Sequence, residues 1–200
     1  KVYSDQDADE LVLLHIDRGT REMDDFVRIV EAVATQCYVP LTAGGGVSRY
    51  EDARRLFEAG ADKVLINSCA YENTKLISAV AFAFGRQAVV VGIDVRSSAG
   101  NHDLYSDCGR KRQFASLEDH IKAVQIAGAG ELMVQDIERD GTMAGYNLDL
   151  IRDVRDELHG LPKILAAALF LDDGVENLAG GEVVHPREHA GGEALVVAEI

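Results

Sequence analysis

Short apolar runs alternate with amphipathic segments along most of this chain, and this alternation limits its fold more than any other feature. The apolar runs are nearly continuous, as in strands of a parallel sheet buried on both faces, and the amphipathic segments have the length of crossover helices. We therefore predict an α/β fold, with strands over residues 10–16, 39–43, 63–67, 88–95, 131–137 and 163–167 and helices over 23–35, 49–59, 73–84, 116–127 and 147–158.

Two segments depart from this alternation. The polar stretch 97–113 reads as a long loop or a small hairpin, and the last thirty residues contain only one recognisable segment, a terminal strand over 193–200. There is also an internal echo, because "ADELVLLHID-RGT" at 8–20 resembles "AGELMVQDIERDGT" at 129–142, with Glu10 matching Glu131. A repeat of this length suits two halves of one barrel, so we predict a single (βα)8-barrel domain over residues 1–200.

Composition excludes several classes of protein. The net charge of −14 argues against binding to a phosphate backbone, which needs a basic face. No window approaches the roughly 18 apolar residues of a membrane span, and the acidic start is unlike a signal peptide. Three widely spaced cysteines fit reduced thiols better than disulfides. We expect a cytoplasmic protein that binds neither nucleic acid nor membranes.

Three consecutive glycines, Gly44, Gly45 and Gly46, follow the second predicted strand. Loops at the carboxyl ends of parallel strands form the ligand-binding face, and glycines there let backbone N–H groups approach a phosphate. Ser48 is placed to cap the next helix, and the following strand ends in Asn67 and Ser68 on the same rim. The pattern indicates a phosphate site, with a tight turn as the alternative.

Carboxylates end two other predicted strands. Asp94 follows an apolar run, where a general acid or base is expected, although such a group can also cap the next loop. The sixth strand leads into "DIERDGT", in which several acidic residues precede Gly141 and Thr142. One rim cannot hold so many unpaired charges, so some of Asp136, Glu138 and Asp140 must be loop or capping groups.

Glu10, Lys63 and Glu131 lie at the opposite ends of their strands. Charges at the bottom of a barrel usually stabilise the fold, and a ring of alternating charge can also close a pore. His185 and His189 have the spacing of two metal ligands on a helix, but Pro186 disfavours helix at His185 and no third ligand stands out. We predict no metal and no cofactor.

The segments "DELVLLHID", "VPLTAGGGV…EDARRLFEAGADKVLIN", "QAVVVGID" and "AGAGELMVQDIERDGTMAGYNLDLI" resemble the cyclase subunit of imidazole glycerol phosphate synthase, a (βα)8 barrel of histidine biosynthesis. The resemblance runs from about residue 8 to 165. It implies that a partner glutaminase supplies ammonia through the barrel and that a bisphosphate substrate becomes imidazole glycerol phosphate and an aminoimidazole ribotide.

The resemblance also implies residue roles. The glycine loop with Asn67 and Ser68 would hold one phosphate, Asp94 would be one of two catalytic aspartates, and Asp140 with Gly141 and Thr142 would order the substrate. A charged gate for ammonia would contain Glu10, Lys63 and Glu131, and the glutaminase would dock beside Asp62 and Gln87 to form a heterodimer.

Some expected features are missing. The family's other catalytic aspartate and a gate arginine belong to a strand before this chain begins, His15 replaces an aspartate, and the second phosphate loop is not recognisable after residue 167. We expect the sequence to be incomplete. Three alternatives stay open: a paralogous subunit for sugar amination in surface-polysaccharide synthesis, a non-catalytic scaffold that channels ammonia, and the related sugar-phosphate isomerase, which lacks the gate.

Overall fold

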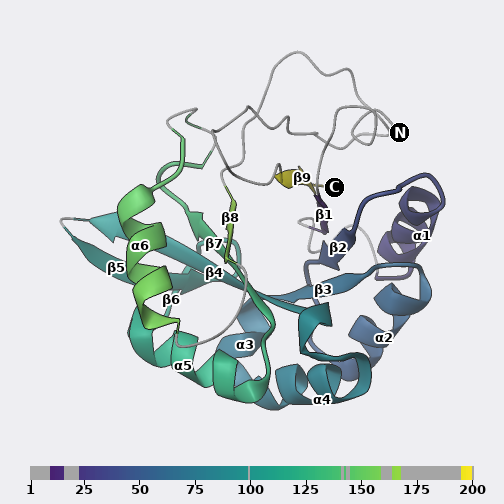
Figure 1. Ribbon diagram of the computed structural model, residues 1–200, viewed down its shortest axis with the longest axis horizontal. Coiled ribbons are helices and arrows are strands. Elements are labelled where there is room, and N and C mark those ends of the chain that lie inside the picture. Colours follow the sequence, from purple (N-terminus) through teal and green to yellow (C-terminus); the bar gives the residue numbers. More distant parts are fainter. Residues whose placement is uncertain are drawn as a thin grey trace. The chain divides into compact units, whose positions relative to one another are not determined.

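The computed structural model describes residues 10–15, 23–98, 100–140, 142, 145–158, 164–167 and 195–199. Its internal contacts divide the chain into two compact units, residues 1–65 with 169–200 and residues 66–168. Strands and helices alternate along the chain, which confirms the α/β class expected of a (βα)8-barrel sequence (Figure 1). None of the described helices has the length and apolar character needed to cross a membrane.

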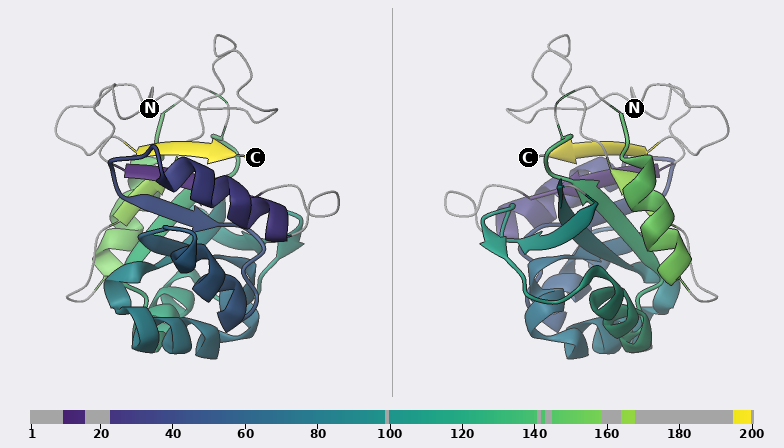
Figure 2. Two further views of the ribbon diagram at one scale, coloured as in Figure 1. Left: turned by 90° about the vertical axis from the view of Figure 1, so that its right-hand side faces the viewer. Right: turned by 90° about the vertical axis from the view of Figure 1, so that its left-hand side faces the viewer.

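The first unit is a small parallel sheet with two helices. In chain order it contains β1 (Glu10–Leu14), α1 (Met23–Ala34), β2 (Leu41–Gly44), α2 (Tyr50–Glu58), most of β3 (Lys63–Ile66) and β9 (Leu195–Glu199). β1 pairs in parallel with β2 and with β9, and β2 pairs in parallel with β3. Figure 2 shows the yellow β9 alongside the purple β1. The predicted terminal strand is therefore confirmed as a neighbour of β1.

The second unit combines a parallel sheet with an antiparallel extension. It contains α3 (Ser68–Glu72), α4 (Thr74–Phe84), a 3-10 turn (Arg86–Ala88), β4 (Val89–Ser98), β5 (Asn101–Ser106), β6 (Lys111–Arg112), α5 (Leu117–Ala127), β7 (Glu131–Asp136), α6 (Leu148–Glu157) and β8 (Ile164–Ala167). β7 pairs in parallel with β4 and β8, whereas β5 pairs antiparallel with β4 and β6. β4 is thus the strand at which the two kinds of pairing meet.

Apolar side chains fill the space between strands and helices in each unit. In the first unit, Phe26 and Val30 of α1 and Ala53 and Leu56 of α2 are fully buried, as the amphipathic pattern predicts. In the second, β4 is buried along seven consecutive residues, so neither of its faces meets solvent there. This explains why its sequence is a continuous apolar run instead of an alternating one.

Of the two interpretations of the stretch 97–113, the small hairpin is confirmed, because β5 and β6 form a hairpin that continues from β4. The short helix α3 was not predicted, since five residues are too few to show a helical period. Ser48 is not the cap of the helix after the glycines.

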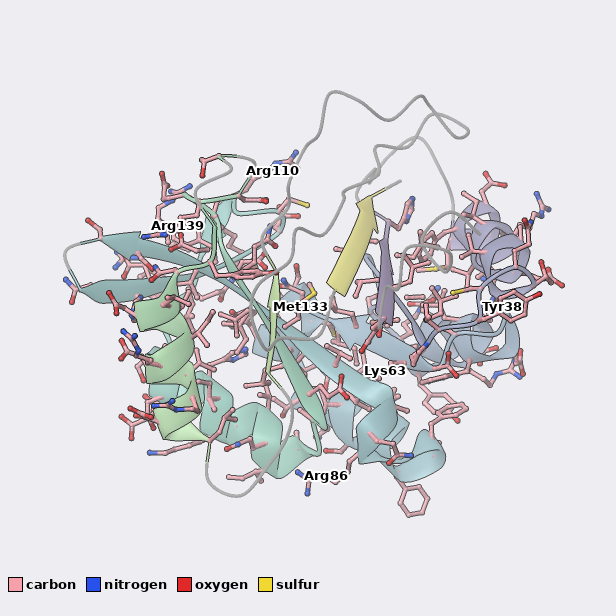
Figure 3. All side chains as sticks on the ribbon, turned by 45° about the horizontal axis from the view of Figure 1, so that its top comes forward. Tyr38, Lys63, Arg86, Arg110, Met133 and Arg139 are labelled. Carbon is pink, nitrogen blue, oxygen red and sulfur yellow. The ribbon has the colours of Figure 1, made fainter. Side chains whose placement is uncertain are left out.

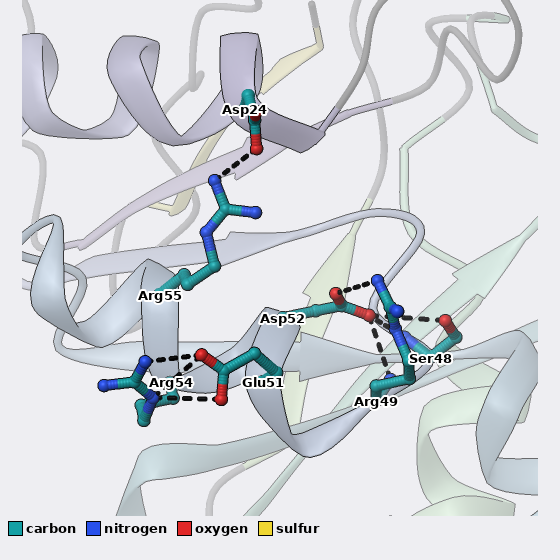
Figure 4. Close-up of polar contacts among 7 residues, drawn as sticks. All are labelled: Asp24, Ser48, Arg49, Glu51, Asp52, Arg54 and Arg55. Atoms are coloured by element: carbon teal, nitrogen blue, oxygen red, sulfur yellow. Dashed lines mark hydrogen bonds and ion pairs between the residues drawn. The ribbon is translucent and has the colours of Figure 1, made fainter.

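The start of α2 is held by a carboxylate inside the helix. Arg49 is the N-cap residue, and the buried Asp52 accepts hydrogen bonds from the backbone N–H of Arg49 at 2.9 Å and of Ser48 at 3.1 Å (Figure 4). The Ser48 hydroxyl also donates to Asp52, at 3.3 Å. Burial acts to raise the pKa of Asp52. The pKa nevertheless lies below its usual value, because these N–H groups stabilise the ionised carboxylate. Asp52 therefore stabilises the start of α2, the role that the sequence predicted for Ser48.

Candidate active site

The glycine loop follows β2 in the first unit, and the structure gives separate reasons for its three residues. A Cβ at Gly44 would lie 2.7 Å from the Cβ of Leu65 on β3, and a Cβ at Gly45 would lie 2.2 Å from the carbonyl oxygen of His15. Gly45 and Gly46 both have positive φ, at 94° and 73°. Only Gly46 has open space, with its nearest neighbour a methyl group of Met23 at 3.9 Å. The close contacts at Gly44 and Gly45 are therefore made by other residues of this chain, Leu65 and His15.

We predict that Gly45→Ala destabilises the fold far more than Gly46→Ala. Both substitutions place a Cβ on a left-handed residue, which costs about 1–2 kcal/mol. Only Gly45→Ala also drives that Cβ into the His15 backbone, which cannot rotate away, for a total of about 3 kcal/mol or more. Urea unfolding of both variants measures the difference, and equal midpoints would show that the His15 contact is absent in solution.

A buried ion pair joins the amino ends of the strands in the first unit. Lys63 Nζ lies 3.0 and 2.9 Å from the two carboxylate oxygens of Glu10, and the Thr42 hydroxyl donates to the same carboxylate at 2.7 Å. Glu10 and Thr42 are buried, and the side chain of Lys63, at the start of β3, reaches Glu10 on β1 (Figure 3). Parallel register brings the three residues together from three successive strands.

In the second unit, four polar residues gather around the carboxyl end of β4. Asp94 is 8% exposed and accepts a hydrogen bond from Asn67 Nδ2 at 2.8 Å. Gln135 is the register partner of Asp94 on β7, so both side chains lie on one face of the sheet. Gln135 Nε2 in turn donates to Asp140 at 2.6 Å. The structure thus brings the predicted residues Asn67, Asp94 and Asp140 to the same face.

Asp136 lies on the opposite face. Its register partner is Val95, one residue beyond Asp94, and side chains alternate along a strand. Its carboxylate accepts from the Glu138 N–H at 3.1 Å and from Asn147 Nδ2 at 2.6 Å, while Glu138 pairs with Arg96 at 2.6 Å. Of the three acidic residues in "DIERDGT", Asp136 and Glu138 therefore shape the loop, and Asp140 is the one on the Asp94 face.

Two aromatic residues that sequence reasoning missed stack on each other, and one of them, Tyr71, interacts with Asp94. Tyr71, on α3, stacks on His120 of α5 with ring centroids 4.0 Å apart and planes inclined by 9°. Burial, with a smaller contribution from the charge of Asp94, raises the pKa of Tyr71, and burial lowers the pKa of His120 to about 4. Both side chains are consequently neutral at pH 7. Along the sequence, this pair is marked only by the position of Tyr71, four residues after the strand-end residue Asn67.

We predict that His120 makes the protein less stable in mild acid. Its pKa is about 4 in the folded protein, against an ordinary histidine value of 6.5, so the unfolded chain takes up a proton first as the pH falls. Between pH 7 and pH 5 this lowers the free energy of unfolding by about 2 kcal/mol. His120→Phe keeps a ring against Tyr71 and should lose that part of the pH dependence in urea titrations at the two pH values. An unchanged pH dependence would contradict the prediction.

The other predicted site residues are placed as follows. Glu131 is buried at the start of β7 in the second unit, Ser68 accepts from the Asp107 N–H at 3.0 Å, and Thr142 is exposed and donates to the Arg139 carbonyl at 2.7 Å. Asp62 and Gln87 are exposed just before β3 and β4. Gly141 and the segment from His185 to His189 lie outside the described residues.

Within the described ranges, no three histidine, cysteine, aspartate or glutamate side chains are grouped to hold a metal ion. His15 is buried and stacks on Phe26 with centroids 5.1 Å apart, so its ring packs against α1.

Comparison with known proteins shows which family the chain belongs to. Residues 1–167 match the histidine biosynthesis protein family. The chain belongs to this family. The imidazole glycerol phosphate synthase subunit HisF of Exiguobacterium sibiricum is 39% identical over 200 residues, an alignment that covers all of this chain and 76% of that relative. The resemblance inferred from the motifs is confirmed, and the histidine biosynthesis family accounts for the alternation of parallel strands and helices in both units.

Proposed function

We propose that this chain is the cyclase subunit of an imidazole glycerol phosphate synthase, a lyase that uses ammonia to convert a bisphosphate ribulosyl-formimino substrate to imidazole glycerol phosphate and an aminoimidazole ribotide. The observation that carries the proposal is the buried Asp94 carboxylate, fixed by Asn67 at the carboxyl end of β4. Membership of the histidine biosynthesis family and the identity to HisF support the same activity.

In this proposal Asp94 exchanges protons with the substrate during ring closure and cleavage. The hydrogen bond from Asn67 orients the carboxylate, and burial of Asp94 strengthens its interaction with nearby charge. Gln135 holds Asp140 on the same face, where Asp140 with Gly141 and Thr142 would order the substrate. One phosphate would bind at the glycine loop, and Asn67 and Ser68 are the further residues to which the family resemblance assigns phosphate binding. Gly46 is the glycine whose surroundings leave room for a ligand.

Ammonia would enter past the charged residues at the amino ends of the strands. The Glu10–Lys63 pair is a closed ion pair in the structure, and Glu131 occupies the equivalent position on β7. We propose that these residues gate ammonia delivered by a cytoplasmic glutaminase subunit, which docks beside the exposed Asp62 and Gln87 and forms a heterodimer with this chain.

The experiment that tests this function is turnover of the bisphosphate substrate with an ammonium salt, so that no glutaminase is needed. Steady formation of imidazole glycerol phosphate supports the cyclase. Absence of turnover by the folded, full-length protein contradicts it and favours either a non-catalytic ammonia-channelling scaffold or the paralogous subunit for sugar amination. Isothermal titration with the bisphosphate separates these two, because a subunit specific for sugar amination would not bind it.

A further inference from the structure

Three side chains of the second unit form a hydrogen-bonded series away from the Asp94 face. Ser97 on β4 and His102 on β5 are register partners, and Ser97 Oγ lies 3.0 Å from His102 Nδ1. His102 Nε2 lies 2.9 Å from Asp153 Oδ2 on α6, whose label stands beside the β5 hairpin in Figure 1. Ser97 is three residues after Asp94, so the two side chains point to opposite faces of β4.

Asn147 fixes the direction of the hydrogen bonds that it makes in this series. Asn147 is the N-cap of α6, and its Oδ1 accepts from the Leu150 N–H at 3.2 Å. Its Nδ2 must therefore donate, to Asp136 at 2.6 Å and to Ser97 Oγ at 3.2 Å.

Since Ser97 Oγ accepts from Asn147, its own proton is available to His102 Nδ1. The Asp153 carboxylate only accepts, so Nε2–H donates to it, and Nδ1 of an imidazole with a single N–H is left to accept the Ser97 proton.

We propose that Ser97 is a nucleophile toward small activated acyl esters, with His102 as its general base and Asp153 as the residue that orients the imidazole. A hydroxyl within hydrogen-bond reach of a base, with the base held by a third group, is the arrangement that activates serine. Asn147 adds an N–H donor to the attacking oxygen and so stabilises negative charge on it. The site is independent of the cyclase reaction.

The two half-reactions balance without any further reagent. Ser97 Oγ attacks the ester carbonyl, its proton passes to His102 Nδ1, and the C–O bond to the alcohol breaks as His102 returns that proton to the leaving oxygen. Water then loses a proton to Nδ1 and attacks the acyl carbon, and the proton returns to Ser97 Oγ as the carboxylic acid leaves.

The site is partly accessible. The side chain of His102 is 12% exposed and that of Asp153 is 57% exposed, while Ser97 is half-buried. Solvent screens an exposed carboxylate, so Asp153 should contribute less to the reactivity of Ser97 than His102 does.

The test is labelling of the intact chain with an alkyl fluorophosphonate, which traps activated serines: an Oγ–P bond forms, the P–F bond breaks, and the proton reaches water through His102. Peptide fragmentation by mass spectrometry should place the adduct on Ser97. We expect His102→Gln to slow labelling about 100-fold, Asp153→Asn to slow it less than tenfold, and the adjacent, exposed Ser98→Ala to leave it unchanged.

The wild-type chain alone can overturn the proposal. If Ser97 is labelled no faster than an exposed serine such as Ser116, it is not activated, whatever the folding of the variants. If Ser97 is labelled and p-nitrophenyl acetate also gives an acetyl adduct at Ser97, the acyl-ester chemistry stands. Labelling that is equally fast in a folded His102→Gln variant would remove His102 as the base.

Discussion

Asp94→Asn is expected to reduce ammonium-dependent turnover by about a thousandfold, because an amide cannot exchange protons as a carboxylate does. The asparagine Oδ1 can still accept the hydrogen bond that Asn67 Nδ2 donates at 2.8 Å, so the side chain keeps its position and its packing. The fold should therefore lose little stability. Steady-state kinetics with an ammonium salt, together with urea unfolding, measure the two effects separately.

Asp25→Asn is the matched control for that variant. Asp25 lies in the first turn of α1, where its exposed carboxylate pairs with Arg28, and it belongs to none of the proposed site residues. It should retain full turnover. If Asp94→Asn also retains full turnover, Asp94 is not the acid or base and the catalytic assignment fails.

Lys63→Met should strongly destabilise the first unit. Glu10 is only 3% exposed, and removal of the ammonium group takes away the positive charge that lies 2.9 Å from its carboxylate. Breaking a buried pair by removing one partner typically costs about 3–5 kcal/mol, since the remaining charge is poorly solvated. The free energy of unfolding in urea gives the effect directly.

The double variant Glu10→Gln with Lys63→Met separates the charge from the packing. It has no buried charge at this position, and the glutamine oxygen can still accept from the Thr42 hydroxyl, so it should recover much of the lost stability. Lys122→Met is the surface control, because Lys122 pairs with Glu118 in solvent and its loss should matter little. A double variant less stable than Lys63→Met would contradict the buried-charge explanation.

The same double variant tests the proposed gate. With a glutaminase present, glutamine-dependent turnover should change while turnover from an ammonium salt added directly should not. Equal behaviour of the two ammonia sources would leave the ion pair with a stabilising role alone, which is the alternative that the sequence already suggested.

The regular elements were largely predictable, because each depends on local periodicity. The helix predicted over 116–127 begins after Ser116, the N-cap residue, whose hydroxyl accepts from the Asp119 N–H at 3.0 Å. The hairpin at β5 and β6 was less predictable, since its pairing depends on β4, and α3 was too short to give a period.

The candidate site also has a part that was predictable from the sequence and a part that was not. Polar residues at strand ends could be recognised from sequence as site candidates, and Asp94, Asn67 and Asp140 do share a face. The residue pattern alone could not separate Asp140 from Asp136, because both lie where β7 ends, and only the family resemblance pointed to Asp140. Strand register decides that Asp136 points to the other face, toward Asn147.

Spacing and chemical type along the chain determined the α/β class, the positions of most strands and helices, and the need for glycine at positions 44 to 46. Tertiary structure alone decided what those glycines meet, that Glu10 pairs with Lys63, and that Ser97 meets His102 and Asp153. The physical reason is that local propensity acts over a few residues. Hydrogen bonds and ion pairs between strands depend on a register that is set by packing across the whole unit.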